Sequence, residues 1–390
     1  MKHGMKYGMR NGITLQSWGF DPWFAAHAAE MAMEGCDVAR VCAVDRGAYR
    51  IQGEGGEVPA ELSGRLAYHT DSPADLPCVG DWVTAQWHSD ATAGIIHRVF
   101  PRRTVLRRKA AGDGCGVQMI AANIDTAFIV QSCHYDFNPG RLERYLVMLA
   151  DGGVEPVVVL TKTDLVTPED LGNLVAVVAA VTPARVIALS SVTGAGLDVL
   201  RQALAPGRTY CLLGSSGVGK TTLLNQLTNG QAGAGVLDGQ ALATRADRAT
   251  RADRATRADR ATRAVSATGE GTHTTTRRQL TMLDGGALVV DTPGMREVGT
   301  VAAADGVDAG FADIALLAGE CRYADCRHEH EAGCAVRAAV DRGELSATHY
   351  RNYLKLRKEA AFSEMSQLDR RRKDKAFGKM VKSVKKHKGY

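Results

Sequence analysis

The spacing of hydrophobic positions changes along the chain, and each change predicts a different architecture. Between about residues 37 and 109, short β-rich runs such as ARVCAVDRGAYRIQ and GDWVTAQW are separated by Gly, Pro and Asp-Ser turns, a pattern typical of a small barrel or sandwich. From residue 120 onward, apolar strands alternate with helical segments, which predicts a parallel sheet of the α/β class. The first thirty-odd residues show no clear period, and we assign them no chemistry.

The final segment, from about residue 311, combines three closely spaced cysteines, a helical stretch over 349–361 and a basic tail. It is predicted to be a small appended domain. At 390 residues the chain exceeds what one hydrophobic core usually supports, so two or three domains are expected. Because the sequence has no run of eighteen apolar residues and no continuous apolar segment at its N-terminus, we expect a cytoplasmic protein without a membrane span.

Charge and cysteine are both unevenly distributed. The formal net charge is +5, yet residues 370–390 hold ten Lys and Arg against one Asp, so the rest of the chain is slightly negative. A basic block at a terminus is either a solvated tail or a nucleic-acid contact. The nine cysteines are scattered apart from the last three, which argues against a disulfide framework and for a local metal site in a reduced protein.

A hexapeptide repeat, ATRADR three times followed by ATRA, fills residues 243–264. It lacks the apolar positions that a β-solenoid would bury. We interpret it as a low-complexity insertion, whose seven Arg and three Asp allow incidental contact with RNA.

The strongest chemical signal is GSSGVGKTT at residues 214–222, which matches G-x-x-x-x-G-K-[ST]. An apolar strand over 209–213 runs into this segment and LLNQL continues it as a helix, the context that a phosphate-binding loop requires. Glycines let backbone N–H groups turn toward the phosphates. Lys220 is expected to reach the β- and γ-phosphates, and Thr221 to hold Mg²⁺. The predicted phosphate-binding residues are Gly214, Ser215, Ser216, Gly217, Val218, Gly219, Lys220, Thr221 and Thr222.

The strand ALVV ends in Asp291-Thr292-Pro293-Gly294, about seventy residues after the phosphate loop, where a GTPase switch is expected. Asp291 is a candidate catalytic residue that holds Mg²⁺ through water, and the Gly294 N–H is a candidate donor to the γ-phosphate. Met295 follows, where many GTPases have a glutamine that orients water. A methionine cannot orient water, so intrinsic hydrolysis is predicted to be slow or to use another group.

That other group is sought in GTHTTT, residues 271–276, which lies between the phosphate loop and Asp291. Its position suits a segment that senses the γ-phosphate. Thr274 or Thr275 is a candidate Mg²⁺ ligand, and His273 is a candidate for positioning water, although a lone loop histidine is more often solvated.

A base-reading segment, TKTD at residues 161–164, directly follows an apolar strand. Asp164 can accept hydrogen bonds from guanine N1–H and N2–H₂, which adenine cannot donate, while the Lys162 stem packs over the ring. Alone, the pattern also fits a helix cap. The later SSVTGAG segment resembles the loop behind guanine in GTPases and strengthens the interpretation. The predicted base-binding residues are Thr161, Lys162, Thr163, Asp164, Ser190 and Ser191.

Three cysteines and a histidine are spaced C-x₄-C-x-H-x₅-C near the C-terminus. Thiolate and imidazole ligands at this spacing suit a closed tetrahedral Zn²⁺ site, which a short domain with little apolar sequence is expected to need for folding. His330 competes with His328 for the fourth position. The predicted ligands are Cys321, Cys326, His328 and Cys334.

The order of these motifs resembles the RsgA/YjeQ family of circularly permuted GTPases. The guanine segment precedes the phosphate loop, and the switch, D-T-P-G and zinc segments follow it; GDWV, RRTVLRRKAA and AANIDTAFIV also match. The resemblance implies an OB-fold over 37–112, a permuted P-loop GTPase core over 113–310 containing the repeat, and a mostly helical zinc domain with the basic tail over 311–390, after an N-terminal extension over 1–36. It further implies ribosome-stimulated hydrolysis of GTP, and late maturation of the small ribosomal subunit through contact with its rRNA.

Three departures and two alternatives remain at this point. Thr161 stands where the family most often has Asn, which puts nucleotide affinity in doubt. The Arg-rich repeat is an extra insertion, and the N-terminal extension has no counterpart in the family. A P-loop kinase or ATPase is disfavoured by Asp164. An RNA-binding assembly factor that binds nucleotide with little intrinsic hydrolysis is kept open by Met295. No sequence feature demands a dimer, so we expect a monomer that binds GTP and GDP with Mg²⁺.

Overall fold

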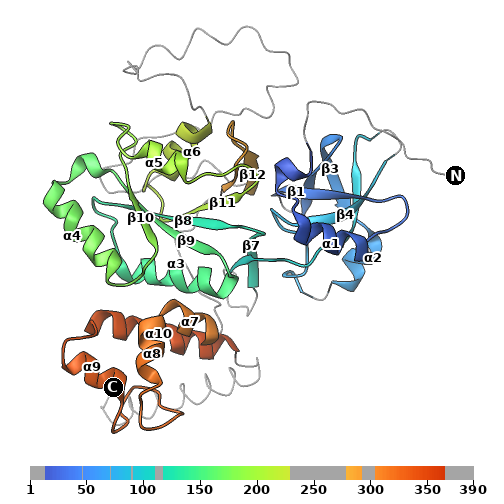
Figure 1. The fold of residues 1–390 in the computed structure, drawn as a ribbon. Coiled ribbons are helices and arrows are strands. Elements are labelled where there is room, and N and C mark those ends of the chain that lie inside the picture. Colours follow the sequence, from blue (N-terminus) through green and yellow to red (C-terminus); the bar gives the residue numbers. More distant parts are fainter. Residues whose placement is uncertain are drawn as a thin grey trace, which may run out of the picture.

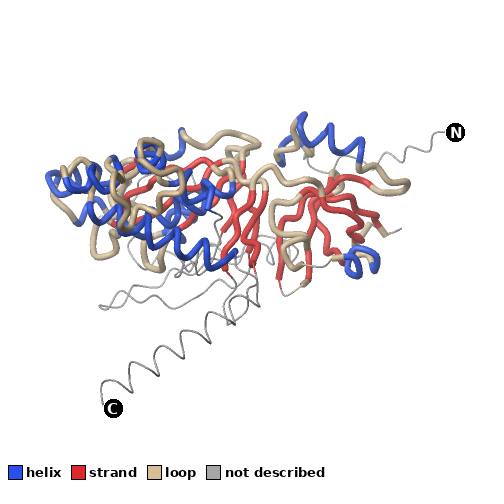
Figure 2. The backbone as a smooth tube through the Cα atoms, turned by 90° about the horizontal axis from the view of Figure 1, so that it is seen from below, coloured by secondary structure: helices blue, strands red, loops and turns tan. Residues whose placement is uncertain are grey.

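The computed structural model describes residues 14–45, 47–70, 72–88, 91–109, 117–228, 278–291 and 304–364. Within them, an N-terminal barrel, a helix-flanked α/β sheet and a group of C-terminal helices follow one another along the chain (Figure 1, Figure 2). No helix in these ranges is long and apolar enough to cross a bilayer. The predicted domain boundaries stay predictions.

The N-terminal barrel is a five-stranded sheet that closes on itself. Around the barrel, β1 pairs with β2, β2 with β3, β3 with β5, β5 with β4, and β4 again with β1. Side chains such as Val41, Ile51 and Ile96 are fully buried inside it. The closure resolves the choice between barrel and sandwich in favour of the predicted OB-type barrel. Its elements are β1 (Asp37–Asp45), β2 (Ala48–Gly53), β3 (Gly56–Leu62), α2 (Gly64–His69), β4 (Trp82–Trp87) and β5 (Gly94–Val99).

The predicted parallel sheet is confirmed, in the order β10-β9-β8-β11-β13-β12. The first five strands are parallel and β12 is antiparallel to β13. A separate hairpin, β6 (Val105–Lys109) with β7 (Val117–Ala122), precedes it. The strands are β8 (Thr126–Ser132), β9 (Glu155–Thr161), β10 (Arg185–Ala188), β11 (Thr209–Leu213), β12 (Arg278–Met282) and β13 (Leu288–Asp291).

Helices cover both faces of this sheet and give a three-layer arrangement (Figure 1). On one face lie α3 (Pro139–Gly152) and α4 (Pro168–Ala179), with Leu142 and Val178 buried in the first core cluster. On the other lie α5 (Leu197–Gln202) and α6 (Lys220–Thr228), with Leu200 and Leu223 in the second. One apolar face of each helix packs on the sheet, while Val177 of α4 and Val199 of α5 are exposed.

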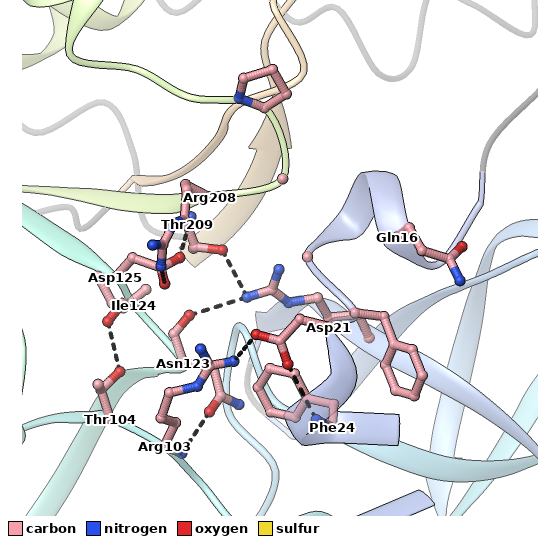
Figure 3. A pocket seen from close by; sticks show the side chains of 15 residues that line it. Gln16, Asp21, Phe24, Arg103, Thr104, Asn123, Ile124, Asp125, Arg208 and Thr209 are labelled. Atoms are coloured by element: carbon pink, nitrogen blue, oxygen red, sulfur yellow. Dashed lines mark hydrogen bonds and ion pairs between the residues drawn. The ribbon is translucent and has the colours of Figure 1, made fainter. Parts of the chain in front are cut away.

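The barrel joins the α/β sheet through β1, which pairs with β12 and extends one sheet to eleven strands. Arg40 on β1 is 1% exposed. It donates hydrogen bonds to the Thr209 hydroxyl of β11 (2.9 Å) and to the carbonyls of Asn123 (3.2 Å), Gly80 (3.2 Å) and Trp18. Arg40, Asn123 and Thr209 line a cavity of about 390 Å³, in which Figure 3 labels Asn123 and Thr209. Burial lowers the pKa of Arg40 to about 10, so the group stays charged at neutral pH.

The segment before the barrel contains structure that the sequence pattern did not predict. A short 3-10 helix, η1 (Gln16–Trp18), precedes α1 (Pro22–Glu30), which Asp21 caps through the backbone N–H groups of Trp23 and Phe24. Phe24 packs against Trp82 of the barrel at 5.7 Å between ring centroids. These elements are only three and nine residues long, so their periodicity is too short to recognise.

The C-terminal helical unit, residues 304–364, packs against α3 (Figure 1). Its core contains Val307, Phe311 and Tyr353, and Val147 of α3 belongs to the same buried cluster. An added Cβ at Gly310 would lie 2.9 Å from the Val147 Cα, so this position has room for little more than hydrogen. The helices are α7 (Ala304–Gly310), α8 (Ala312–Ala318), α9 (Ala335–Asp341) and α10 (Ala347–Glu364).

Candidate nucleotide site and metal centre

The predicted nucleotide segments meet at one edge of the sheet. Because β9, β11 and β13 run in parallel, the residues that follow them emerge at the same edge, where open α/β sheets bind ligands. Thr161 ends β9, and Gly214 follows the end of β11. Asp291 ends β13 and pairs with Leu212, two residues before Gly214. The three candidate segments are thus neighbours in space despite their separation in the sequence.

The phosphate loop, residues 214–222, needs glycine for geometric reasons. Gly214 has φ of 149°, and an added Cβ would lie 2.3 Å from the Val130 carbonyl oxygen. Gly217 and Gly219 have φ of 81° and 99°, a region that side chains disfavour. Lys220 begins α6, and its Nζ donates to the carbonyls of Gly214 (2.7 Å) and Ser215 (2.5 Å). Val218 is buried, while Thr221 and Thr222 follow in the first turn of α6.

Thr161 ties the end of β9 to the phosphate loop. Its hydroxyl lies 2.7 Å from the Val218 carbonyl and 3.2 Å from the Gln131 carbonyl, and the residue is 2% exposed. A hydroxyl has one proton, so it donates to one of these acceptors at a time. The threonine therefore supplies a direct link between the two nucleotide segments.

The remaining base-segment residues form a tight turn. Lys162 has φ of 59°, unusual for a residue with a side chain, and Thr163 and Asp164 lie in a 3-10 helix, η2 (Thr163–Leu165). The Ser190 hydroxyl donates to the Asp164 carboxylate and accepts from the backbone N–H groups of Val192 and Thr193. The structure thus brings Ser190 against Asp164, while the carboxylate itself stays exposed.

Some sequence-predicted residues lie outside the described ranges. This applies to the switch candidates, the methionine after them, the repeat and the basic tail. The candidates concerned are His273, Thr274, Thr275, Gly294 and Met295. Their proposed roles stay predictions.

Two contacts of the site were not apparent from the sequence. Arg141, in the first turn of α3, donates to the Ser215 hydroxyl of the phosphate loop. Gln226 of α6 donates to the Ser191 carbonyl at 2.6 Å and holds the loop behind Asp164. Both are ordinary polar positions of amphipathic helices, so no local signal distinguishes them.

The four predicted metal ligands do come together. The ligand atoms of Cys321, Cys326, His328 and Cys334 all lie within 4.8 Å of one another. His328 Nδ1 is 3.5 Å from the sulfurs of both Cys321 and Cys334. His330 is exposed and outside the group, which decides between the two histidines. Three thiols and one imidazole converging in this way can hold one metal ion.

The surroundings of the cluster favour the metal-binding form of two members, Cys321 and His328, whereas burial and the neighbouring thiols raise the pKa of Cys326 to about 11. Backbone N–H groups at the start of α9 hydrogen-bond the Cys321 sulfur, which outweighs burial and lowers the pKa of this thiol. Burial lowers the pKa of His328, which keeps the imidazole neutral. The Tyr350 hydroxyl donates to the His328 carbonyl, and the Glu331 carboxylate accepts from the N–H groups of Arg327, Glu329 and His330. The donor set and its support fit a structural metal.

A buried charge cluster joins the C-terminal helical unit to α3. His349 of α10 is 4% exposed, and its Nδ1 lies 2.6 Å from the Glu143 carboxylate of α3. Its Nε2 lies 3.1 Å from the Asp313 carboxylate of α8. Burial alone would lower the pKa of His349, but hydrogen bonds to Asp313 and Glu143 raise it to about 9. The imidazole is therefore charged at neutral pH.

This shift predicts a stability that falls with rising pH. The pKa of His349 is about 9 in the folded protein and 6.5 ordinarily. The charged imidazole therefore contributes fully to the free energy of unfolding below pH 6.5, and this contribution is lost as the pH rises through 9. We expect His349→Gln to lower the free energy of unfolding by on the order of 2–3 kcal/mol at pH 6, and the difference from wild type to vanish by about pH 9.5. Urea unfolding at several pH values measures it; a pH-independent difference would contradict the assignment.

Together, the parallel sheet, the phosphate loop after β11 and the aspartate segment after β9 define a P-loop GTPase in circularly permuted order. The family model described as RsgA GTPase matches residues 99–301, just over half of the chain. A small ribosomal subunit biogenesis GTPase RsgA from Opitutus terrae is 39% identical over 90% of this chain and 91% of its own. One from Xylella fastidiosa strain M23 is 41% identical over 88% and 94%. The chain therefore belongs to the RsgA GTPase family.

Two solved structures show the same fold. YjeQ from Thermotoga maritima superimposes with a TM-score of 0.60 at 23% identity, covering 84% of this chain and 99% of its own. YloQ, described as a circularly permuted GTPase, gives 0.55 at 20% identity, covering 85% and 98%. At these identities the likeness supports the architecture.

Proposed function

We propose that the chain hydrolyses GTP to GDP and phosphate, and that it does so while bound to the small ribosomal subunit during its late maturation. One observation carries the enzymatic part: the Thr161 hydroxyl contacts the Val218 carbonyl, so the guanine segment and the phosphate loop form one site. The names of its relatives, small ribosomal subunit biogenesis GTPases, support the ribosomal part.

Residue roles follow from this site. Lys220 stabilises charge on the transferring phosphoryl group, and the phosphate-loop N–H groups bind the phosphates. Thr221 and Asp291 are the proposed holders of Mg²⁺, with Thr274 or Thr275. That ion neutralises charge between the β- and γ-phosphates when bound. Gly294 is the proposed γ-phosphate donor and His273 the proposed water-positioning residue.

The other parts of the chain are proposed to serve binding to RNA. A closed five-stranded barrel and the basic residues 370–390 both suit contact with rRNA. We propose that Zn²⁺ occupies the three-thiol, one-imidazole cluster as a structural ion. We further propose a cytoplasmic monomer in which GTP favours ribosome binding and hydrolysis favours release, because the chain passes from the Asp291 segment directly into the C-terminal helical unit.

Base specificity offers a direct test of the guanine assignment. In Asp164→Asn, one carboxylate oxygen that accepts from guanine is replaced by an amide N–H₂ group. That group faces guanine N–H donors, so at least one of the hydrogen bonds to the base is lost. We expect GTP affinity to fall by about 100-fold and affinity for xanthosine triphosphate, whose C2 carbonyl can accept from the amide, to rise. Equilibrium binding of both nucleotides measures this.

The matched control for Asp164→Asn is Glu169→Gln, which removes an exposed carboxylate in the first turn of α4. It should bind GTP as the wild type does. Unchanged GTP affinity in Asp164→Asn would mean that this carboxylate does not read the base, and the guanine assignment would have to be withdrawn.

A further inference from the structure

Helix α3 contacts the nucleotide site at its first turn. The Arg141 guanidinium donates to the Ser215 hydroxyl, and Ser215 is 7% exposed, so the second residue of the phosphate loop points toward α3. The same guanidinium donates to the Asp136 carboxylate (2.9 Å) and, through its other nitrogen, to the Asp136 carbonyl (2.9 Å). Held at three acceptors, Arg141 fixes the loop before α3 and the phosphate loop to each other.

The same helix contacts the C-terminal helical unit over its middle turns. The Glu143 carboxylate meets His349 Nδ1 at 2.6 Å and accepts from the Asn352 amide at 2.6 Å. Arg144 makes a bidentate pair with Glu359 of α10 at 2.7 and 2.8 Å. Val147, on the same helix, is fully buried in the core of that unit.

Helix α3 is capped at both ends and packed against the sheet. Asn138 caps its N-terminus by accepting from the Arg141 N–H at 2.9 Å, and Gly153 ends it in a left-handed conformation. Leu142, Tyr145 and Leu149 are fully buried beneath it. A capped, well-packed helix of fourteen residues transmits a displacement at one turn to the next rather than absorbing it.

We propose that Arg141 is a positioning residue for the GTPase reaction, which holds the phosphate loop through Ser215 and couples nucleotide binding to the docking of the C-terminal helical unit through Glu143 on the same helix. This inference rests on the proposed binding of GTP at the phosphate loop. In this proposal, α3 carries the coupling between the nucleotide site and the C-terminal helical unit, separately from the chain connection after Asp291. By linkage, each event strengthens the other by the same factor.

A double-mutant cycle on the full-length, metal-loaded protein tests the coupling. Dissociation constants for a non-hydrolysable GTP analogue are measured for wild type, Arg141→Lys, Glu143→Ala and the double variant. Arg141→Lys keeps the positive charge but loses the planar guanidinium, whose two nitrogens reach Ser215 and Asp136 together. We therefore expect this variant to bind the analogue about 10-fold more weakly. Glu143→Ala removes contacts to His349 and Asn352 and leaves the Arg141 contact to Ser215 in place; it should weaken binding by about 3- to 10-fold, and the double variant by less than the product of the two. Arg201→Lys alters an exposed pair with Asp198 on α5 and should bind normally.

Ser215→Ala is a second variant, because it removes the acceptor and leaves the contact between Arg141 and Asp136 in place. It should reproduce part of the loss seen in Arg141→Lys. The reciprocal readout is amide hydrogen exchange in α10, which the analogue should slow in the wild type and leave unchanged in Arg141→Lys.

The outcomes separate this inference from the proposed function. If the wild type fails to bind the GTP analogue, the proposed function itself fails. If the wild type binds it but Arg141→Lys and Ser215→Ala bind equally well, the positioning role of Arg141 is overturned. If the losses in the cycle simply multiply, the coupling role is overturned. In both cases the GTPase assignment stands.

Discussion

Replacing Lys220 with alanine is expected to lower GTP turnover by about 100- to 1,000-fold while the fold is retained. Lys220 is the first residue of α6, and its Nζ donates hydrogen bonds to the phosphate-loop carbonyls of Gly214 and Ser215. A single preorganised donor that meets developing charge on a transferring group contributes an effect of this size. Phosphate release under saturating GTP, with Mg²⁺ present, measures it.

Lys355→Ala is the matched control for Lys220→Ala, since Lys355 is an exposed lysine on α10. It should turn over GTP at the wild-type rate. Wild-type turnover in Lys220→Ala, with GTP still bound, would show that the phosphate loop does not perform the hydrolysis, and the catalytic role of the loop would be wrong.

Loss of the metal is expected to unfold the C-terminal helical unit. The cluster joins Cys321, Cys326 and His328, from the connection between α8 and α9, to Cys334 at the cap of α9, so it closes a segment with little apolar sequence. Metal binding in small zinc domains is worth roughly 10–16 kcal/mol, enough to decide whether such a domain folds. Cys334→Ser should therefore lose bound zinc and amide protection in α9 and α10, while the barrel and the α/β sheet keep theirs.

Zinc content and hydrogen exchange, each with and without a strong chelator, test this prediction. Cys36→Ser is the control, because Cys36 is a half-buried cysteine beside the barrel and outside the cluster. It should keep one zinc per chain. Retention of protection in α10 after complete chelation would show that the unit folds without the ion.

The sequence predicted the α/β part closely because its elements are local and strongly patterned. The strand expected over 209–213 is observed as β11 with the same bounds, since its apolar run is closed by Gly207 before it and Gly214 after it. The convergence of the aspartate segment and the phosphate loop follows from parallel pairing, which the alternation of strands and helices implies.

The parts that could not be predicted depend on contacts between distant segments. Closure of the barrel is decided by pairing of β1 with β4, about forty residues apart in sequence, and no local pattern distinguishes it from a sandwich. Arg40, Arg141 and Glu143 are charged residues that the sequence gives no reason to bury or to pair. Helix α7, with the sequence ADGVDAG, has too few apolar positions to be recognised before its packing on α3 is seen.

The most direct test of the account is GTP hydrolysis by the purified protein, alone and with added small or large ribosomal subunits, with Lys220→Ala as the blank. We predict slow turnover alone and strong stimulation by small subunits, with no stimulation by large ones. Equal turnover under all three conditions would contradict the proposed coupling to the small subunit and leave a GTPase whose partner must be sought elsewhere.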